Sequence, residues 1–291
     1  MGKILDLASF SIYNKIKKRG RSFMNVHDYL TTFSDEEEKP LDRMIEGVGL
    51  CGILRTIGCV GDSLSSGEFE TLDADGKQHY YDVFDYSWGQ FMAREAGITV
   101  YNFSRGGMSA RQYMETFADE KDFWNPEKKC KAYIIALGVN DLFNNHEDLG
   151  SVADICAEDY RKNTPNFAGH YAMIIQRLKE ISPDAKFFFM TMPKETYGIL
   201  REKMKDFHAE LLYDFAKYFP NSYVLDLRRY APVYDECFKE KFYLNGHMNA
   251  CGYAFTAKMV LSYIDYIIRH HMEDFREIGL VNTPWKNHKR A

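Results

Sequence analysis

From residue 53 onward, short apolar runs alternate with longer segments of helical periodicity. This alternation is typical of a parallel sheet, because two parallel strands need a crossover connection, usually a right-handed one through a helix. Five strands are expected, at residues 53–60, 99–103, 132–137, 186–190 and 223–227. The alternation of strands and helices predicts an α/β fold: a three-layer α/β/α sandwich around a five-stranded, mostly parallel, flavodoxin-like sheet.

The segments between these strands favour helices. In residues 167–181, apolar side chains recur every three or four positions, and Pro183 disfavours helix just beyond them. The same pattern predicts further helices at residues 88–97, 109–117, 200–218 and 253–271.

Residues 1–50 do not follow the alternation, and we expect an N-terminal extension packed on a main domain of residues 51–291. Residues 70–86 form a second interruption. Within it, residues 73–77 (Asp-Ala-Asp-Gly-Lys) resemble a hairpin turn. Its aromatic residues are expected to line a pocket beside Ser63; they are Tyr80, Tyr81, Phe84 and Tyr86.

Ser63 follows the first apolar run, in the sequence Gly61-Asp62-Ser63-Leu64. Gly-Asp-Ser predicts a sharp turn at the carboxyl end of a buried strand, and ligands bind at that edge of open α/β sheets. A helix starting there also directs its free backbone N–H groups at the same place. The position favours a role for the Ser63 hydroxyl in binding or catalysis.

The composition limits the possible partners. A net charge of -5, from 37 basic and 42 acidic residues, does not favour nucleic acid, and the basic run at residues 15–21 is interpreted as a solvated helix end. The six cysteines include no Cys-x-x-Cys pair, so no structural metal is expected, and those beside strand runs are interpreted as free thiols. We find neither a signal peptide nor an apolar stretch of ~20 residues, which favours a soluble, cytoplasmic enzyme without a membrane partner.

Four sequence blocks follow one another along the chain. They are Gly61-Asp62-Ser63-Leu64, Asn102-Phe103-Ser104-Arg105-Gly106-Gly107, Gly138-Val139-Asn140-Asp141 and His247-Met248-Asn249-Ala250-Cys251-Gly252-Tyr253. In this order they give the chain a resemblance to the SGNH (GDSL-like) esterases and lipases, over roughly residues 53–270. The first and third blocks are the most specific.

The resemblance implies a role for each block. Ser63 would be the nucleophile and His247 the base that accepts its proton, because a serine hydroxyl attacks only when a base activates it. The backbone N–H groups of Ser63 and Gly107 and the side-chain amide of Asn140 would form the oxyanion hole. We interpret Asp141 as a residue that fixes its loop.

The chain departs from the family at Leu244, where an Asp three residues before the histidine usually orients the imidazole. Three possibilities are open. His247 is held by a backbone carbonyl in a Ser-His dyad; another carboxylate replaces the Asp, with Asp226, Glu236 and Glu240 as candidates; or the domain has lost catalysis.

Two further residues are candidates for substrate binding. Arg105 lies in the loop that carries Gly107, where it meets an anionic substrate, pairs with Asp62 or faces solvent. Tyr243 precedes the histidine block and is expected to shape the pocket wall.

The sequence therefore predicts a carboxylic ester hydrolase, a serine esterase acting on short-chain O-acyl esters, with a small acyl group on a carbohydrate as the favoured substrate and no metal or organic cofactor. The alternative is a catalytically impaired module that binds carbohydrate or acyl groups. A phosphate or nucleotide site is disfavoured because no Gly-rich phosphate motif with its Lys is present. The acyl chain, the alcohol half of the substrate and the oligomeric state are left open.

Overall fold

The computed structural model describes residues 37–196 and 198–287. The basic run at 15–21 and most of the proposed N-terminal extension lie outside these ranges, and the division into domains stays a prediction. The described end of the extension packs on helix α11 (Ala250–His270): the backbone N–H of Ile45 donates to Ser262 Oγ at 3.0 Å, and that of Leu50 donates to Asp265 Oδ1 at 2.7 Å.

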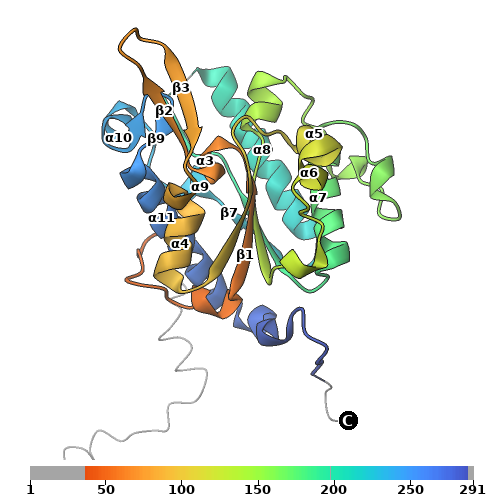
Figure 1. Ribbon diagram of the computed structural model, residues 1–291. Coiled ribbons are helices and arrows are strands. Elements are labelled where there is room, and N and C mark those ends of the chain that lie inside the picture. The colour runs from red at the N-terminus through yellow and green to blue at the C-terminus, as the bar shows by residue number, and fades with distance from the viewer. Residues whose placement is uncertain (1–36, 197, 288–291) are drawn as a thin grey trace, which may run out of the picture. The chain divides into compact units, whose positions relative to one another are not determined.

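Five parallel strands form the central sheet, in the order β4-β1-β5-β6-β7. This flavodoxin-like order confirms the predicted fold class, and Figure 1 shows helices on both faces of the sheet. The strands span Thr56–Gly61 (β1), Thr99–Ser104 (β4), Ala132–Ala136 (β5), Lys186–Met190 (β6) and Ser222–Leu225 (β7).

Each face of the sheet has its own core. Ile57 and Cys59 of β1 pack with helices α4 and α11, whereas Val60 packs with α7 and α8. Successive strand residues point to opposite faces of the sheet. An apolar strand with helices packed on each face is therefore buried on both sides. The helices are α3 (Ser63–Ser66), α4 (Trp88–Ala96), α5 (Ala110–Gln112), α6 (Ala118–Glu120), α7 (Phe167–Ile181), α8 (Ile199–Tyr218), α9 (Leu227–Tyr230), α10 (Glu236–Phe242) and α11.

Several element boundaries differ from prediction. The first strand begins at Thr56, because a 3-10 turn at Cys51–Leu54 and a left-handed Arg55 (φ 59°) precede it. The helix expected at 109–117 consists of α5, a π-helical turn at Tyr113–Phe117, and α6. Helix α11 begins earlier than expected because Asn249 caps it, accepting the Gly252 N–H at 2.9 Å.

Two hairpins outside the central sheet approach its carboxyl-terminal edge. Strands β2 (Glu68–Leu72) and β3 (Gln78–Asp82) confirm the turn predicted at 73–77, with Gly76 at φ 77°. Figure 1 shows this hairpin, in orange, projecting from the region of α3. The second hairpin joins β8 (Tyr243–Leu244) to β9 (His247–Met248).

All six cysteines are free thiols, as interpreted for those beside the strands. Within the described residues, none of the helices has the length and apolar character needed to cross a bilayer.

Candidate active site

Ser63 is the first residue of the short helix α3, directly beyond β1. Asp62 caps this helix by accepting the Leu64 N–H at 3.1 Å and is 5% exposed. Burial raises the pKa of the Asp62 carboxyl to about 6. The turn leaves the Ser63 side chain at the mouth of a cleft at the strand ends, as the sequence predicts.

His247 comes from the β8–β9 hairpin, 184 residues further along the chain. Its Nε2 atom lies 3.0 Å from Ser63 Oγ, within hydrogen-bond distance. The hydroxyl and the imidazole predicted as nucleophile and base are therefore adjacent, in the geometry that proton transfer requires.

The other nitrogen of the imidazole faces a carboxylate that sequence reasoning missed. Glu70 Oε2, from strand β2, lies 3.0 Å from His247 Nδ1 and accepts the Gly246 N–H at 2.9 Å. Gln78 on the neighbouring strand β3 donates to the other oxygen of Glu70. With all these contacts the Glu70 side chain is 5% exposed.

Hydrogen bonds keep Glu70 ionised. Burial acts to raise the pKa of its carboxyl, but the hydrogen bonds from His247, Gln78 and Gly246 outweigh it and hold that pKa below the usual value. Gly246 is required for this approach, since a Cβ there would stand 2.5 Å from Glu70 Oε2. An ionised carboxylate on Nδ1 keeps the proton there and leaves Nε2 free to accept one from Ser63.

A second carboxylate, Glu68, also approaches His247, with Oε1 at 3.1 Å from Nε2. Burial, together with the charges of Asp82 and Glu70, raises the pKa of Glu68 although His247 lowers it. Glu68 therefore takes up a proton more readily than an ordinary glutamate.

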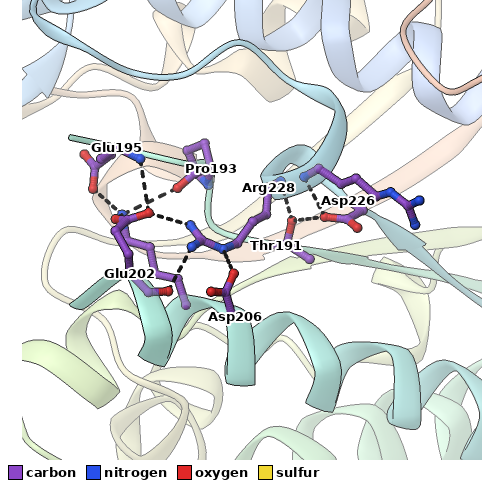
Figure 2. A network of polar contacts seen from close by, with 9 residues as sticks. Thr191, Pro193, Glu195, Glu202, Asp206, Asp226 and Arg228 are labelled. Carbon is purple, nitrogen blue, oxygen red and sulfur yellow. Dashed lines mark hydrogen bonds and ion pairs between the residues drawn. The ribbon is translucent and has the colours of Figure 1, made fainter. Parts of the chain in front are cut away.

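Asp226 does not reach the imidazole, which corrects the candidate role given to it. Its carboxylate accepts hydrogen bonds from Tyr213 Oη at 2.9 Å and Thr191 Oγ1 at 3.1 Å, and it caps helix α9. Figure 2 shows Asp226 directed at Thr191, at the carboxyl ends of β6 and β7. It is a structural anchor there.

Leu244, at the usual Asp position, is paired with His247 across the β8–β9 hairpin, and its side chain is 42% exposed. In the described residues, the carboxylates within ion-pair distance of the imidazole are those of Glu68 and Glu70, neither of which was a candidate. Glu236 and Glu240 are not among them. The carboxylate beside the imidazole thus comes from the β2–β3 hairpin and not from the segment that precedes His247.

The three donors expected to form the oxyanion hole are not fully used by hydrogen bonds within the protein. Asn140 Oδ1 accepts from Asn144 Nδ2 at 2.7 Å, which orients the amide, and one N–H of Asn140 Nδ2 donates to the Met108 carbonyl at 3.0 Å. The second N–H of that amide is left for a ligand. Gly107 adopts φ 73°, in the left-handed region that favours glycine, whereas Gly106 does not have a positive φ. Among the described residues, no hydrogen bond uses the backbone N–H of Gly107 or Ser63.

Asp141 connects the two loops that carry these donors. It is fully buried, and its Oδ1 accepts the Ala110 N–H at 2.7 Å. This hydrogen bond joins the loop of Asn140 to the loop of Gly107, so Asp141 fixes its loop as predicted.

The cleft in front of Ser63 has a volume of about 320 Å³. Tyr243 lines it, together with Ser63, Asn140 and His247. Arg105 does not line it: its guanidinium lies 4.5 Å from the centre of the Phe117 ring, and the structure gives it no ion pair with Asp62. The substrate role proposed for Arg105 therefore finds no support in its position.

Two charged residues of the cleft lining, Glu195 and Lys205, belong to a network of ion pairs, part of which is drawn in Figure 2. Lys205 is buried between Glu195 and Glu202, and its Nζ lies 3.2 Å from Glu202 Oε1. Arg228 then joins Glu202 at 2.8 Å to Asp206 at 2.6 Å. The charges of Lys205 and Arg228 are thus compensated by carboxylates within the protein.

A smaller, mostly apolar cavity of about 80 Å³ adjoins the cleft. Leu64, Val139 and Met192 belong to the linings of both, and Trp88 and Leu227 lie deeper in the cavity. Across the described residues, no three His, Cys, Asp or Glu side chains are grouped to hold a metal ion.

The family model described as GDSL-like Lipase/Acylhydrolase matches residues 57–259, which include Ser63, Glu70 and His247. The chain belongs to this family. It is accordingly an ester-bond hydrolase. A comparison with curated proteins found no match.

Solved structures with the same fold include two carbohydrate esterases. A family two carbohydrate esterase from Clostridium thermocellum, in complex with cellohexaose, is 16% identical with a TM-score of 0.53, over 76% of this chain and 65% of that chain. A family 2 enzyme with a carbohydrate-binding domain, from Corynascus thermopiles (Myceliophthora fergusii), is 16% identical with a TM-score of 0.50, over 72% of this chain and 65% of that chain. At this identity the likeness shows the fold alone.

Buried Asp141 leads to a prediction about stability. Burial and the charge of Glu147 raise the pKa of Asp141 from 3.8 to about 7, against the hydrogen bond from Ala110. Between pH 3.8 and about pH 7, the folded state binds more protons at Asp141 than the unfolded state does. The contribution of Asp141 to the free energy of unfolding therefore falls as pH rises through this range and levels off above about pH 7. Asp141→Asn keeps an acceptor for the Ala110 N–H and removes this dependence.

We therefore expect the variant to gain stability relative to the parent protein from pH 5 to pH 8, as measured by urea unfolding at each pH. A difference in unfolding free energy that stays constant over this range contradicts the prediction.

Proposed function

We propose that the protein is a serine esterase that cleaves short-chain O-acyl esters through an acyl-enzyme on Ser63. The supporting observation is the chain of contacts from Ser63 Oγ to His247 and on to Glu70, both at 3.0 Å. His247 acts as the base. Glu70 acts as a positioning residue that orients the imidazole and stabilises the imidazolium formed when His247 accepts the proton.

The reaction has two halves in this geometry. Ser63 Oγ attacks the ester carbonyl carbon while its proton passes to His247 Nε2, and the negative charge on the carbonyl oxygen meets the N–H groups of Ser63, Gly107 and Asn140. The bond to the alcohol oxygen then breaks, and His247 returns the proton to it. Water attacks the acyl-enzyme by the same route and releases the acid.

The apolar cavity supports a short acyl chain. Its lining contains Val139, next to Asn140, so an acyl group whose carbonyl is held by the Asn140 amide has its chain directed toward the cavity. A volume of about 80 Å³ is roughly half of the ~150 Å³ cavity that accommodates benzene. Such a space suits an acetyl to butyryl chain.

A carbohydrate is the favoured alcohol half. The cleft lining includes polar side chains such as Asn144 and Asn245, and the solved carbohydrate esterases of the same fold support this substrate class. Tyr243, which lines the cleft, is proposed to contact the sugar.

The role of Ser63 is tested with p-nitrophenyl acetate and a fluorophosphonate probe, which labels only an activated serine. Ser63→Ala should lose labelling and lower kcat by about 10⁵- to 10⁶-fold, because the nucleophile is absent. Ser222→Ala, outside the linings of the cleft and of the apolar cavity, is the control and should keep both the labelling and kcat. An unlabelled parent protein supports the alternative of an impaired binding module.

The role of Glu70 is tested by Glu70→Gln, with Asp226→Asn as the control. Loss of the carboxylate should lower kcat by about 10²- to 10⁴-fold. KM should change little, because Glu70 does not line the cleft. Asp226→Asn keeps a competent helix cap and should behave like the parent protein. A large loss of kcat in Asp226→Asn without one in Glu70→Gln reverses the assignment.

Acyl length is tested with p-nitrophenyl acetate, butyrate and octanoate. The octanoate should react at least about 10-fold more slowly in kcat/KM, since its chain exceeds the cavity and misplaces the carbonyl. Met192→Ala enlarges the cavity at the point where it meets the cleft and should shift the preference toward longer chains. Equal rates for all three esters contradict the proposed acyl pocket.

A further inference from the structure

The two faces of the β2–β3 hairpin have different roles. Phe69 faces away from His247 and packs on Tyr86 and Tyr253, which anchors the hairpin to the main body. The opposite face carries the residues that surround the imidazole and their cross-strand partners. These residues are Glu68, Glu70, Gln78, Tyr80 and Asp82.

Tyr80 is the aromatic residue on the face toward the imidazole. It is the cross-strand partner of Glu70, and its ring centre lies 5.7 Å from that of His247, nearly perpendicular to it. Tyr80 is 51% exposed although the Glu70 beside it is buried. A large aromatic surface is thus held beside the base and remains open to a ligand.

The chemistry of the reaction determines which part of the substrate meets Tyr80. His247 Nε2 must pass its proton to the oxygen of the leaving alcohol, so that alcohol lies against the imidazole and its neighbours. The acyl chain lies on the other side of the carbonyl, toward Val139 and the apolar cavity. A ring beside His247 therefore contacts the alcohol half of the ester.

We propose that Tyr80 is the stacking platform for the sugar ring of a carbohydrate ester, an assignment that rests on the proposed esterase function. A pyranose has C–H groups on its faces, which suit the negative face of an aromatic ring, and hydroxyls on its rim. Asn144, Tyr243 and Asn245 line the adjoining cleft and provide hydrogen-bonding groups for those hydroxyls.

A simple aliphatic alcohol gains little from this arrangement, because it has neither a ring to stack nor hydroxyls for the polar wall. The platform thus selects the alcohol half, whereas the apolar cavity selects the acyl half. Selection at Tyr80 should appear as a preference for sugar acetates over acetates of small alcohols.

Tyr81 is a matched control from the same strand. Adjacent strand residues point to opposite faces, and Tyr81 stacks on His79 at 6.3 Å rather than on His247. It is 55% exposed, close to the value for Tyr80. Replacing either tyrosine removes the same amount of aromatic surface from the same hairpin.

The experiment compares acetate release from xylose tetraacetate and from ethyl acetate, which has no ring. We expect Tyr80→Ala to lower the ratio of the two kcat/KM values by about 3- to 10-fold, mainly through KM for the sugar ester. Tyr80→Phe should keep most of the ratio, and Tyr81→Ala should leave it unchanged.

Several results would overturn the proposal. If Tyr80→Ala lowers kcat/KM equally for both esters, Tyr80 only supports His247. If the ratio of the two kcat/KM values is unchanged without a loss on either ester, or falls as much in Tyr81→Ala, there is no sugar platform at Tyr80. A fall for phenyl acetate without one for the sugar ester assigns the platform to aryl alcohols instead.

A binding measurement separates this inference from the proposed function. Titration of xylose tetraacetate into Ser63→Ala, followed by tyrosine and tryptophan fluorescence, needs no turnover. The Ser63→Ala/Tyr80→Ala double variant should bind about 3- to 10-fold more weakly. Equal binding by the two proteins overturns the platform, whereas weaker binding alongside a catalytically inactive parent protein leaves the platform standing and removes the esterase assignment.

Discussion

The candidate active site depends on the two hydrogen bonds of one imidazole. His247 contacts Ser63 through Nε2 and Glu70 through Nδ1, and these two contacts join the β8–β9 hairpin to two residues that precede it by 184 and 177 positions in the sequence. A neutral imidazole has one donor and one acceptor nitrogen, so the carboxylate on Nδ1 decides which nitrogen is free to act as a base. Both hairpins and the end of β1 must be correctly placed for this arrangement to exist.

The β2–β3 hairpin compensates for a missing residue. The usual Asp position holds Leu244, whose side chain is partly exposed, and Glu70 provides the carboxylate from a different element. The hairpin is anchored by Phe69 on one face and hydrogen-bonded through Gln78 on the other. In the proposed mechanism, the same element orients the base and, through Tyr80, contacts the leaving alcohol, which couples substrate selection to the position of the imidazole.

The surroundings of Ser63 divide the proposed substrate into two parts. An apolar cavity of about 80 Å³ lies beyond Val139, and a larger cleft of about 320 Å³ with both polar and apolar lining lies in front of His247. Lys205 lines the cleft and is compensated by Glu195 and Glu202, whereas Arg228 lies outside the cleft lining and is paired with Glu202 and Asp206. Because buried charges are costly unless they are paired, this network of ion pairs allows charged side chains to remain beside the cleft.

The sequence by itself determined the sheet, the position of Ser63 at a strand end, and the glycine and asparagine loops beside it, because each depends on local periodicity or on a short motif. It did not identify Glu70, since Glu68 and Glu70 both lie in an alternating acidic strand and no local signal distinguishes them. It also left Asp226 as a candidate, although that carboxylate is occupied by Tyr213 and Thr191. The carboxylate partner of His247 lies 177 residues before it in the sequence, and their contact depends on how the β2–β3 hairpin packs at the edge of the central sheet. Only the tertiary structure decides that contact, because strand register and the approach of Gly246 are set by packing between distant segments.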